Sequence, residues 1–340
     1  PVSIAIEDGS CTREGGFVAA RKIVSDSTIV GVHGTTCSIS TIPAAEIISE
    51  AGMVMISGCS TTPALTGNDG VKGEHWQPGF FRTAPNDRYQ AIAAAHFAYN
   101  ELKHKKAATV SDGDAYTRGL VSSFEKSFME HGGEIVFSSE VNRGDKNMIP
   151  LLQAIAGTYA EILFFPIFPP EGNYLVEHAK TINSLNSLDL MGADGLLNSV
   201  FVDSIGHSGK GMYFIGPGLP DGEKYQEFFQ DFFNFFEVEP QGTYQAHNYD
   251  AAMILLNSIK ETSYLLDDGS LIIERQSLRD HMRALKEFSG LTGSLSCGET
   301  GDCGVPKYKL FQLDDPDAGY SELQKNVMAT FEYDPDKPSN

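Results

Sequence analysis

The sequence predicts an α/β protein of two lobes, each a parallel sheet with helices on both faces. The length of 340 residues suggests two domains. Hydrophobic residues make up 41% of the chain and charged residues 21%, which is typical of globular domains. Short apolar runs of strand type alternate with runs of helical period, and this rhythm begins again after the basic stretch 103–106. We therefore expect a second α/β unit to interrupt the first.

The first lobe is expected to begin with strands that alternate with helices. The strands are short apolar runs, and the helices carry apolar residues at spacings of three and four. Gly52 ends one helix, and Pro85-Asn86-Asp87 marks the start of another. In chain order the expected elements are strand 2–7, helix 15–25, strand 28–32, helix 42–50, strand 53–57, strand 80–83 and helix 90–102.

The same alternation predicts the second lobe. Gly132-Gly133 stops its first helix, and Asp194-Gly195 comes shortly after one of its strands. The expected elements are strand 107–111, helix 116–131, strand 134–141, helix 148–157, strand 162–166, helix 171–181, strand 188–192 and strand 211–216.

After residue 216 we expect the chain to return to the first lobe. Six phenylalanines fall within 225–236, and their helical spacing predicts a core or interdomain helix. The tail 314–340 is rich in Asp, Pro and Lys, and we expect its end to be mobile. The other expected elements are helices 243–262 and 278–284 and a β-turn-β excursion at 291–313.

Charge and hydropathy exclude several classes of function. The chain carries 45 acidic and 25 basic residues, a net charge of −20, which argues against a nucleic-acid partner. No run reaches the roughly 18 apolar residues needed to span a bilayer, and no signal peptide is visible. The nine histidines do not cluster, and there is no nucleophile-elbow motif GxSxG. We expect no metal and no cofactor.

The five cysteines indicate disulfides. Cys297 and Cys303 are six residues apart across a turn that contains glycine. Cys11 and Cys37 each follow an expected strand, and neighbouring parallel strands would bring their loops together. A zinc site lacks support, because there is no CxxC motif and no histidine at ligand spacing. We expect the pairs Cys11–Cys37 and Cys297–Cys303, with Cys59 left over, and therefore an oxidising compartment outside the cytoplasm.

Two loops rich in Ser and Thr follow neighbouring strands, at 34–38 and 58–63. Ligands of open α/β sheets bind at the carboxyl ends of the strands. Free N–H groups at a helix start, beside hydroxyl groups, suit an anion such as a carboxylate. The sequence therefore predicts a ligand site at this edge.

Several segments in a fixed order carry a family resemblance. They are EDGSCTRE (7–14), VGVHGTTCSISTIPAAEIISEAG (30–52), ISGCSTTPALT (56–66), FFRTAPNDRYQ (80–90), SDGDAYTRGL (111–120), GADG (192–195), YQAHNYDAAMILL (244–256) and GLTGSLSCGETGDCG (290–304). Over nearly the whole chain, the sequence resembles the substrate-binding proteins of branched-chain amino-acid ABC importers, the leucine/isoleucine/valine-binding type. The resemblance implies the type I periplasmic binding protein fold, in which two Rossmann-like lobes joined by a three-strand hinge close on a ligand in the cleft.

The resemblance also implies the extent of the lobes. Lobe 1 would hold 1–103 and 217–305, lobe 2 would hold 104–216 and 306–330, and 331–340 would form a tail. Family members have a further strand and helix before the segment that corresponds to residue 2. We therefore expect a preceding strand and helix, with an aromatic-bearing loop, to be missing from this sequence.

The site residues are implied by matching positions in the family. Ser38 matches a serine that holds the ligand carboxylate, and Asp194 matches the carboxylate that pairs with the ligand ammonium. Cys59 departs from the family, which has a small residue such as Ala or Ser there, and we interpret it as a packing residue. Pro166, Pro169 and Pro170 stiffen a loop of lobe 2 and could reshape the pocket for the ligand side chain, so the specificity for that side chain stays open. The expected ligand-binding residues are Ser38, Cys59, Ser60, Thr61, Tyr116, Phe168 and Asp194.

Each assignment has a plainer alternative. Ser38 is also a plausible helix N-cap, Thr61 a turn residue, and Asp194-Gly195 an ordinary turn. Tyr116 and Phe168 are also explained by packing at a helix start and in a loop.

From these observations we expect an extracytoplasmic solute-binding protein. It would be periplasmic or extracellular, and it could carry a lipid anchor. It would bind a small amino acid or related carboxylate and deliver it to ABC permease membrane subunits, without catalysis. One alternative is an amide- or urea-type sensor of the same fold. Another is a hydrolase that uses Ser38 with His33, which lie five residues apart without an evident third group.

Overall fold

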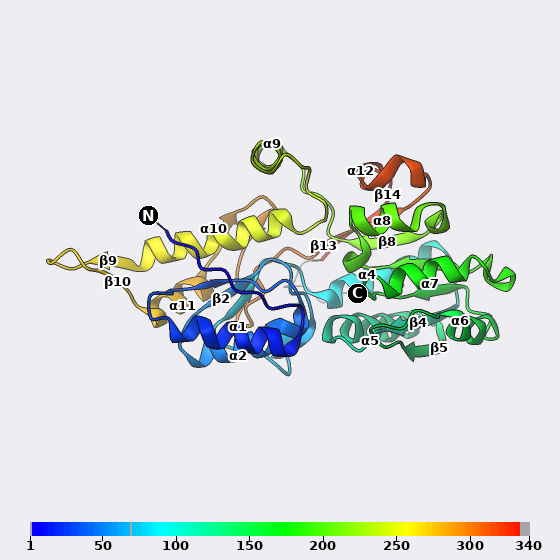
Figure 1. Cartoon of the computed structure of the whole chain (residues 1–340), viewed down its shortest axis with the longest axis horizontal. Coiled ribbons are helices and arrows are strands. Elements are labelled where there is room, and N and C mark those ends of the chain that lie inside the picture. The colour runs from blue at the N-terminus through cyan, green and yellow to red at the C-terminus, as the bar shows by residue number, and fades with distance from the viewer. Residues whose placement is uncertain (1, 69, 334–340) are drawn as a thin grey trace. The chain divides into compact units, whose positions relative to one another are not determined.

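A computed structural model describes residues 2–68 and 70–333 of the chain (Figure 1). These residues form two compact units. Unit 1 holds the residues up to 86 together with 244–305, and unit 2 holds 87–243 together with 306–333. Within the described chain the polypeptide therefore crosses three times between the units, as the resemblance implies. The residues at these crossings lie outside the strands.

The sequence places the lobe boundaries near residues 103 and 216, whereas the compact units divide after 86 and 243. Helix α4 (Asp87–His96) explains the first difference. Its alanines, including Ala91 and Ala95, are fully buried in one cluster with Phe124. Since Phe124 lies on α5 (Ala115–Glu130), α4 packs with unit 2.

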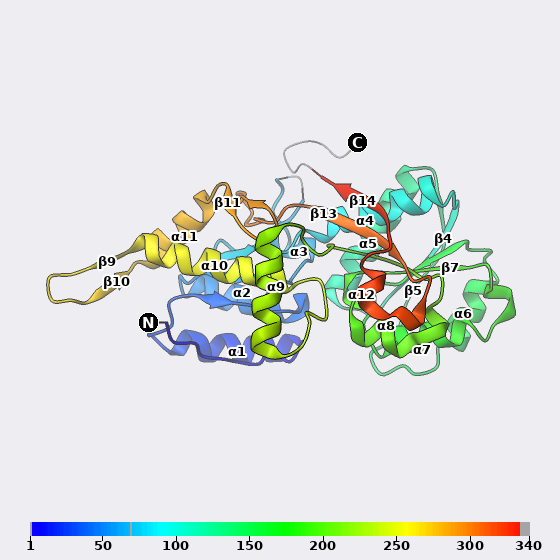
Figure 2. The ribbon, with the colours of Figure 1, turned by 90° about the horizontal axis from the view of Figure 1, so that it is seen from above.

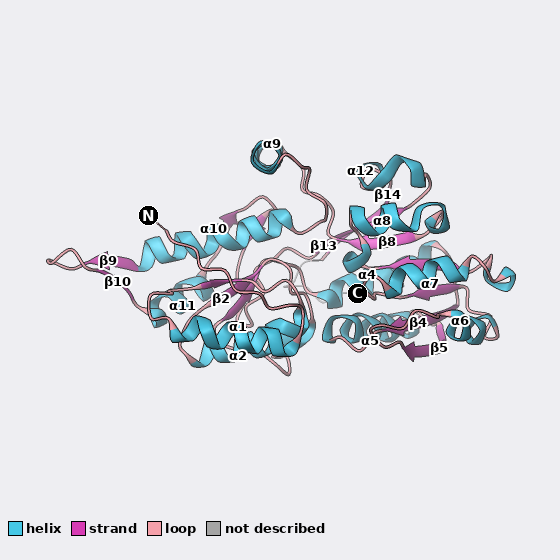
Figure 3. Ribbon diagram, in the orientation of Figure 1, coloured by secondary structure: helices cyan, strands magenta, loops and turns pink. Residues whose placement is uncertain are grey.

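Unit 1 is built on a parallel sheet of three strands in the order β1-β2-β3. The strands are β1 (Val32–His33), β2 (Met55–Ser57) and β3 (Phe80–Arg82). Helices α2 (Ser38–Glu50) and α10 (Gln245–Thr262) both contact β2 and lie on either side of the sheet (Figure 3). Fully buried apolar residues of β2, β3 and α10 form the core. The remaining helices of this unit are α1 (Arg13–Ser25), α3 (Pro63–Thr66) and α11 (Arg275–Ala284).

The first expected strand is wrong. The structure has no strand at 2–7, where Val2, Ile4 and Ile6 are 71, 84 and 88% exposed. The alternating pattern of residues 2–7 suits a strand, but no described strand pairs with this segment. Without a neighbouring strand, its N–H and C=O groups would have no hydrogen-bond partners in the chain. The next strand is shorter than expected, because its register covers only the two pairs Val32–Met55 and His33–Ile56.

The expected β-turn-β excursion at 291–313 is also wrong. Its first strand, β12 (Ser294–Leu295), pairs with β11 (Phe288–Ser289) in unit 1. Its second strand, β13 (Lys307–Gln312), joins the sheet of unit 2 instead, where Leu310 and Phe311 are fully buried. A separate hairpin in unit 1 pairs β9 (Ser263–Leu265) with β10 (Leu271–Ile273).

Both expected disulfides are confirmed, and both lie in unit 1. Cys11–Cys37 joins the loop before α1 to the start of α2, with 5.3 Å between the Cα atoms. Cys297–Cys303 closes a six-residue span, with 3.8 Å between the Cα atoms. Cys59 belongs to neither pair.

Unit 2 is built on a sheet of seven strands in the order β14-β13-β8-β7-β6-β4-β5. Neighbours from β8 to β5 run parallel, and β13 is antiparallel to both β8 and β14. The strands not yet given are β4 (Lys106–Ser111), β5 (Glu134–Glu140), β6 (Ile162–Phe164), β7 (Asp189–Gly192), β8 (Tyr213–Gly216) and β14 (Val327–Glu332).

Helices cover both faces of this sheet (Figure 2). Successive strand residues point to opposite faces, so Phe214 packs in one buried cluster while Tyr213 and Ile215 pack in the other. Helices α4 and α5 cover the second of these faces. The first is covered by α6 (Ile149–Ala156), α7 (Glu171–Ala179), α8 (Ser199–Ile205) and α12 (Gly319–Leu323).

The helix with six phenylalanines is not a core helix of its unit. In α9 (Glu223–Phe236) the one buried residue is Tyr225, while Phe233, Phe235 and Phe236 are 43, 79 and 55% exposed. The expected mobile end of the tail, 334–340, lies outside the described residues. In the part of the chain that is described, no helix is both long enough and apolar enough to cross a membrane.

Candidate functional site

A cluster of hydroxyl groups joins the loop after β1 to the loop after β2 in unit 1. The Cys37 carbonyl oxygen, at the start of α2, accepts hydrogen bonds from Ser40 Oγ at 2.9 Å and Thr41 Oγ1 at 3.0 Å. Thr41 Oγ1 also lies 2.6 Å from Ser60 Oγ in the second loop. Short polar side chains bond readily to nearby backbone groups, so these residues form the polar network that the sequence predicts at this edge.

Ser57, which the sequence analysis did not identify, organises the second loop. It ends β2, and its Oγ accepts hydrogen bonds from the N–H groups of Cys59 at 3.1 Å and Ser60 at 2.9 Å. The same hydroxyl donates to the Thr35 carbonyl oxygen at 2.7 Å. The resemblance places Cys59 and Ser60 in the ligand site, but their N–H groups are engaged within the unit by Ser57.

Ser38 and Thr61 retain hydrogen-bonding capacity. Ser38 is 4% exposed, and its Oγ accepts from the Thr62 N–H at 3.3 Å, which leaves the hydroxyl hydrogen to donate. Thr61 is 1% exposed and forms no hydrogen bond to another described residue. The N-cap of α2 is Cys37, so the alternative role of Ser38 as an N-cap is wrong.

The second residue that the sequence analysis missed is Arg82, at the end of β3. Its guanidinium is fully buried and donates to the carbonyl oxygens of Ser60 at 3.2 Å and Thr62 at 2.8 Å. It also donates to Thr66 Oγ1 at 2.5 Å and to the Asp302 carboxylate at 2.5 Å. A charged residue inside a buried strand must be paired, and that signal alone could have identified Arg82.

Unit 2 carries a second polar cluster around Asp194. This residue begins a short 3₁₀-helix (Asp194–Leu196) directly after β7 and is 8% exposed. Its Oδ1 accepts hydrogen bonds from Tyr116 Oη at 2.8 Å and from Gln90 Nε2 at 2.6 Å. The Asp194 side chain therefore bonds to residues from α5 and α4, which argues against a simple Asp-Gly turn.

Tyr116 is a neutral donor in this cluster. Burial, and then the charge of Asp194, raises the pKa of the Tyr116 phenol well above its usual value of 10.0. Its oxygen accepts from the Gly195 N–H at 3.0 Å. The Phe168 ring lies 5.1 Å from the Tyr116 ring, at an interplanar angle of 30°. A Cβ atom at position 195 would lie 3.0 Å from Phe168 Cε1 and 3.0 Å from Tyr116 Oη, so the close approach of both side chains favours glycine there.

The seven predicted site residues therefore form two groups. Ser38, Cys59, Ser60 and Thr61 lie in the two loops of unit 1, and Tyr116, Phe168 and Asp194 lie together in unit 2. Gln90 was missed, because its contact with Asp194 joins residues 104 positions apart and depends on how α4 packs. The hydrolase alternative is not supported, since no hydrogen bond joins His33 to Ser38 among the described residues.

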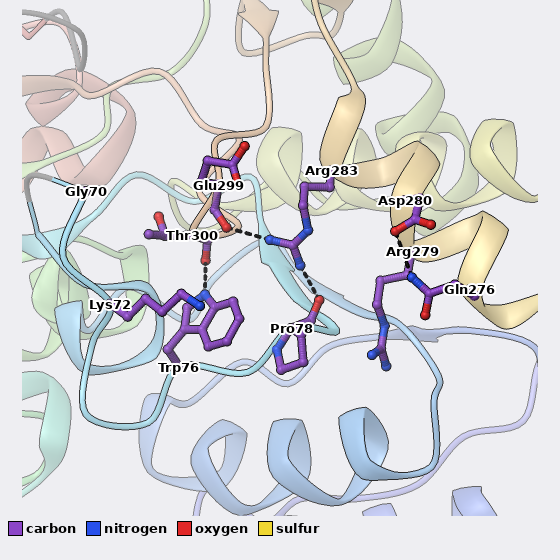
Figure 4. Close-up of a pocket in the computed structure, with 10 residues that line it drawn as sticks. All are labelled: Gly70, Lys72, Trp76, Pro78, Gln276, Arg279, Asp280, Arg283, Glu299 and Thr300. Carbon is purple, nitrogen blue, oxygen red and sulfur yellow. Dashed lines mark hydrogen bonds between the residues drawn. The ribbon is translucent and has the colours of Figure 1, made fainter.

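A surface pocket of about 430 Å³ lies elsewhere in unit 1 (Figure 4). Arg283 of α11 donates to the carbonyl oxygens of Pro78 and Glu299 there. The Lys72 ammonium lies 3.5 Å from the centre of the Trp76 ring. These cations are held by backbone oxygens and an aromatic face, which is a structural arrangement. The pocket is lined by Gly70, Lys72, Trp76, Pro78, Gln276, Arg279, Asp280, Arg283, Glu299 and Thr300, none of which is a predicted site residue.

Comparison with protein families matches residues 1–319 to the family described as "Periplasmic binding protein". Among known relatives, the leucine-, isoleucine-, valine-, threonine-, and alanine-binding protein of Pseudomonas aeruginosa is 26% identical over 299 residues, 87% of this chain and 74% of the relative. An amino acid binding protein of the same organism is 30% identical over 179 residues, 53% of this chain. That match spans 46% of the relative's own length.

Solved structures share the fold. The leucine binding protein LivK of Thermotoga maritima has a TM-score of 0.80 at 19% identity, covering 98% of this chain and 87% of LivK. A solute binding protein from R. palustris, solved in complex with benzoate, has a TM-score of 0.75 at 20% identity. This match covers 92% of this chain and 82% of the R. palustris chain. At such identities the likeness establishes the architecture and leaves the ligand open.

Proposed function

The chain belongs to the periplasmic binding protein family, and from this premise we propose that it binds a small α-amino acid outside the cytoplasm and delivers it to an ABC permease. The proposal includes a periplasmic or extracellular location, in agreement with the two disulfides. It includes no catalysed reaction. Two relatives, matched over 74% and 77% of their own length, are named as a leucine-, isoleucine-, valine-, threonine-, and alanine-binding protein and as a Leu/Ile/Val-binding protein.

The observation that carries the proposal is the pair of hydrogen bonds to Asp194 Oδ1 in unit 2. Both donors, Tyr116 Oη and Gln90 Nε2, are uncharged, and together they hold the carboxylate in one orientation. A buried carboxylate is stabilised best by a cation at hydrogen-bonding distance. We assign that role to the ammonium group of the ligand, with the rings of Tyr116 and Phe168 beside it.

The hydroxyl cluster of unit 1 suits the other end of an amino acid. A carboxylate is recognised by several N–H and O–H donors, and Ser38 and Thr61 each retain a hydroxyl hydrogen that no described residue accepts. One ligand that engages both clusters would favour the conformation in which both contacts are made. Its differential affinity for that conformation would then shift the population toward it.

An aromatic carboxylate is the second candidate, because a structural relative was solved with benzoate and Tyr116 and Phe168 form an aromatic pair. Asp194 argues against it, since benzoate has no cationic group to pair with a carboxylate. The amide-type sensor of the same fold likewise predicts a ligand without an ammonium group.

Calorimetric titration of three related ligands tests the proposal. L-Leucine, 4-methylpentanoate and 3-methylbutylamine differ only in whether the carboxylate and the ammonium are present. We expect leucine to bind, and Asp194→Asn to weaken it by about 2–5 kcal/mol, as for a lost partner of a buried charge pair. Asp203→Asn, an exposed aspartate of the same unit, is the matched control. Equal binding of leucine to Asp194→Asn and wild type would contradict the assignment, and tight binding of benzoate alone would favour the second candidate.

A further inference from the structure

We propose that Gln90 is a ligand-binding residue that makes this site selective for a primary ammonium group. It would fix the Asp194 carboxylate through its Nε2 and accept a hydrogen bond from the ligand through its Oε1. The inference rests on the proposed function, since it refines the ammonium end of the same site.

The Gln90 side chain has one orientation that the contacts allow. Nε2 lies 2.6 Å from Asp194 Oδ1 and 3.4 Å from the Ile215 carbonyl oxygen, which are both acceptors. Exchanging the two ends of the amide would place Oε1 against two oxygens, with no hydrogen between them. The amide nitrogen therefore faces Asp194, and this contact holds the carboxylate in place together with Tyr116.

The other end of the amide is an acceptor without a donor. Gln90 is fully buried, and Oε1 has no hydrogen-bond partner among the described residues. A buried polar atom in that state is unusual, and it points to a group that the chain itself does not supply. Since Nε2 and Oε1 share one carbon atom, Oε1 also lies close to the Asp194 carboxylate. A donor bound to Asp194 would be near enough to satisfy it.

An ammonium group matches this pair of acceptors. It carries three N–H donors, so it can bond to Asp194 and Gln90 at the same time. A quaternary ammonium has the same charge but no N–H group, and it would leave Oε1 unsatisfied. The inference therefore separates recognition of charge, which belongs to Asp194, from recognition of N–H groups, which belongs to Gln90.

The test uses L-alanine, L-leucine and L-phenylalanine, each with its N,N,N-trimethyl analogue, in calorimetric titrations. For wild-type protein we expect each trimethyl analogue to bind roughly tenfold or more weakly than its parent, since a hydrogen bond to a charged group is lost. Gln90→Met keeps the length of the side chain but removes both polar atoms. We expect it to weaken binding of the parent amino acids roughly tenfold and to change the affinity of the analogues much less. Gln153→Met, at an exposed position of α6, is the control.

The outcomes separate the two proposals. If no amino acid binds to wild-type protein, the proposed function is overturned and the inference with it. If the amino acids bind and Asp194→Asn weakens them, but Gln90→Met weakens parents and analogues equally, then Gln90 is only structural. If Gln90→Met does not fold, the wild-type comparison still decides, because equal affinity for parents and trimethyl analogues overturns the inference.

Discussion

Replacing Arg82 with methionine tests whether a single buried cation holds the ligand loop of unit 1. Methionine keeps an unbranched apolar stem of similar length and removes the guanidinium. In the native protein this group is 0% exposed and donates to three acceptors of the loop, the oxygens of Ser60, Thr62 and Thr66. Its fourth partner is the Asp302 carboxylate, whose side chain is 31% exposed.

The expected loss follows from these partners. Water can reach Asp302, so that carboxylate is partly compensated when the guanidinium is removed. The loop oxygens are buried, and each buried acceptor that loses its donor costs about 1–3 kcal/mol before relaxation. Three such acceptors lose their donor in Arg82→Met, which after relaxation amounts to about 3–5 kcal/mol in total. We expect Arg82→Met to destabilise unit 1 by that amount, and Arg82→Lys, which reaches fewer acceptors, by about half.

The assay is urea unfolding followed by fluorescence of Trp76, the single tryptophan of the chain, which lies in unit 1. Because two units need not unfold together, this signal isolates the unit that contains Arg82. Arg275→Met is the control in the same unit, since Arg275 is exposed and donates one hydrogen bond, to the Ala51 carbonyl oxygen at 2.7 Å. We expect it to cost less than about 1 kcal/mol. Equal effects of the two substitutions would refute the role assigned to Arg82.

Three further predictions concern the disulfides, the buried phenol and Gly195. The two disulfides span sequence separations of 26 and 6 residues. For these separations the loop-closure model predicts that replacing both cysteines of a pair with serine costs about 3.5 kcal/mol for Cys11–Cys37 and about 2.2 kcal/mol for Cys297–Cys303. Urea unfolding that ranks the two double variants in the reverse order would contradict the model. Burial raises the pKa of Tyr116 above 10.0, so as pH rises the unfolded chain loses this proton before the folded protein does. The stability of unit 2 should therefore fall as pH rises above about 10. Circular dichroism should show that Tyr116→Phe is less stable than wild type at about pH 8, and that its stability falls less steeply between about pH 9 and 11. Gly195→Ala places a Cβ 3.0 Å from Phe168 Cε1 and Tyr116 Oη and should weaken leucine binding by about 1–3 kcal/mol through overpacking; unchanged affinity in titration would show that the rings can move apart.

The sequence predicts the elements of this fold well where a strand is buried on both faces. Ile162, Leu163 and Phe164 of β6 are all fully buried, and a continuous apolar run is the expected signature. It predicts poorly where pairing decides the outcome. Residues 2–7 have the alternation of a strand but no described partner, and β13 looked like one arm of a hairpin until its pairing with β8 placed it in another unit.

The candidate site shows the same division between local and distant information. Each hydroxyl loop is visible in the sequence, because Ser and Thr follow an apolar run. The roles of Ser57 and Gln90 are not, since Ser57 reaches Thr35 in the other loop and Gln90 reaches Asp194 in another layer of unit 2. For Arg82 the sequence gives part of the answer. A charge within a buried strand predicts that the residue is paired, but it does not identify the partners.

Arg82 also bears on how the hydroxyl end of the site would hold an anion. The guanidinium donates to the Ser60 carbonyl oxygen, which belongs to the same peptide group as the Thr61 N–H. A charged donor on the oxygen polarises that peptide and makes its N–H a stronger donor. The buried cation would thus act on a ligand carboxylate through one peptide group without contacting it. We expect Arg82→Met to weaken leucine and 4-methylpentanoate by the same factor, because both carry the carboxylate, and to leave 3-methylbutylamine unaffected. Asp194→Asn should show the opposite pattern, so that the two variants separate the two ends of one ligand.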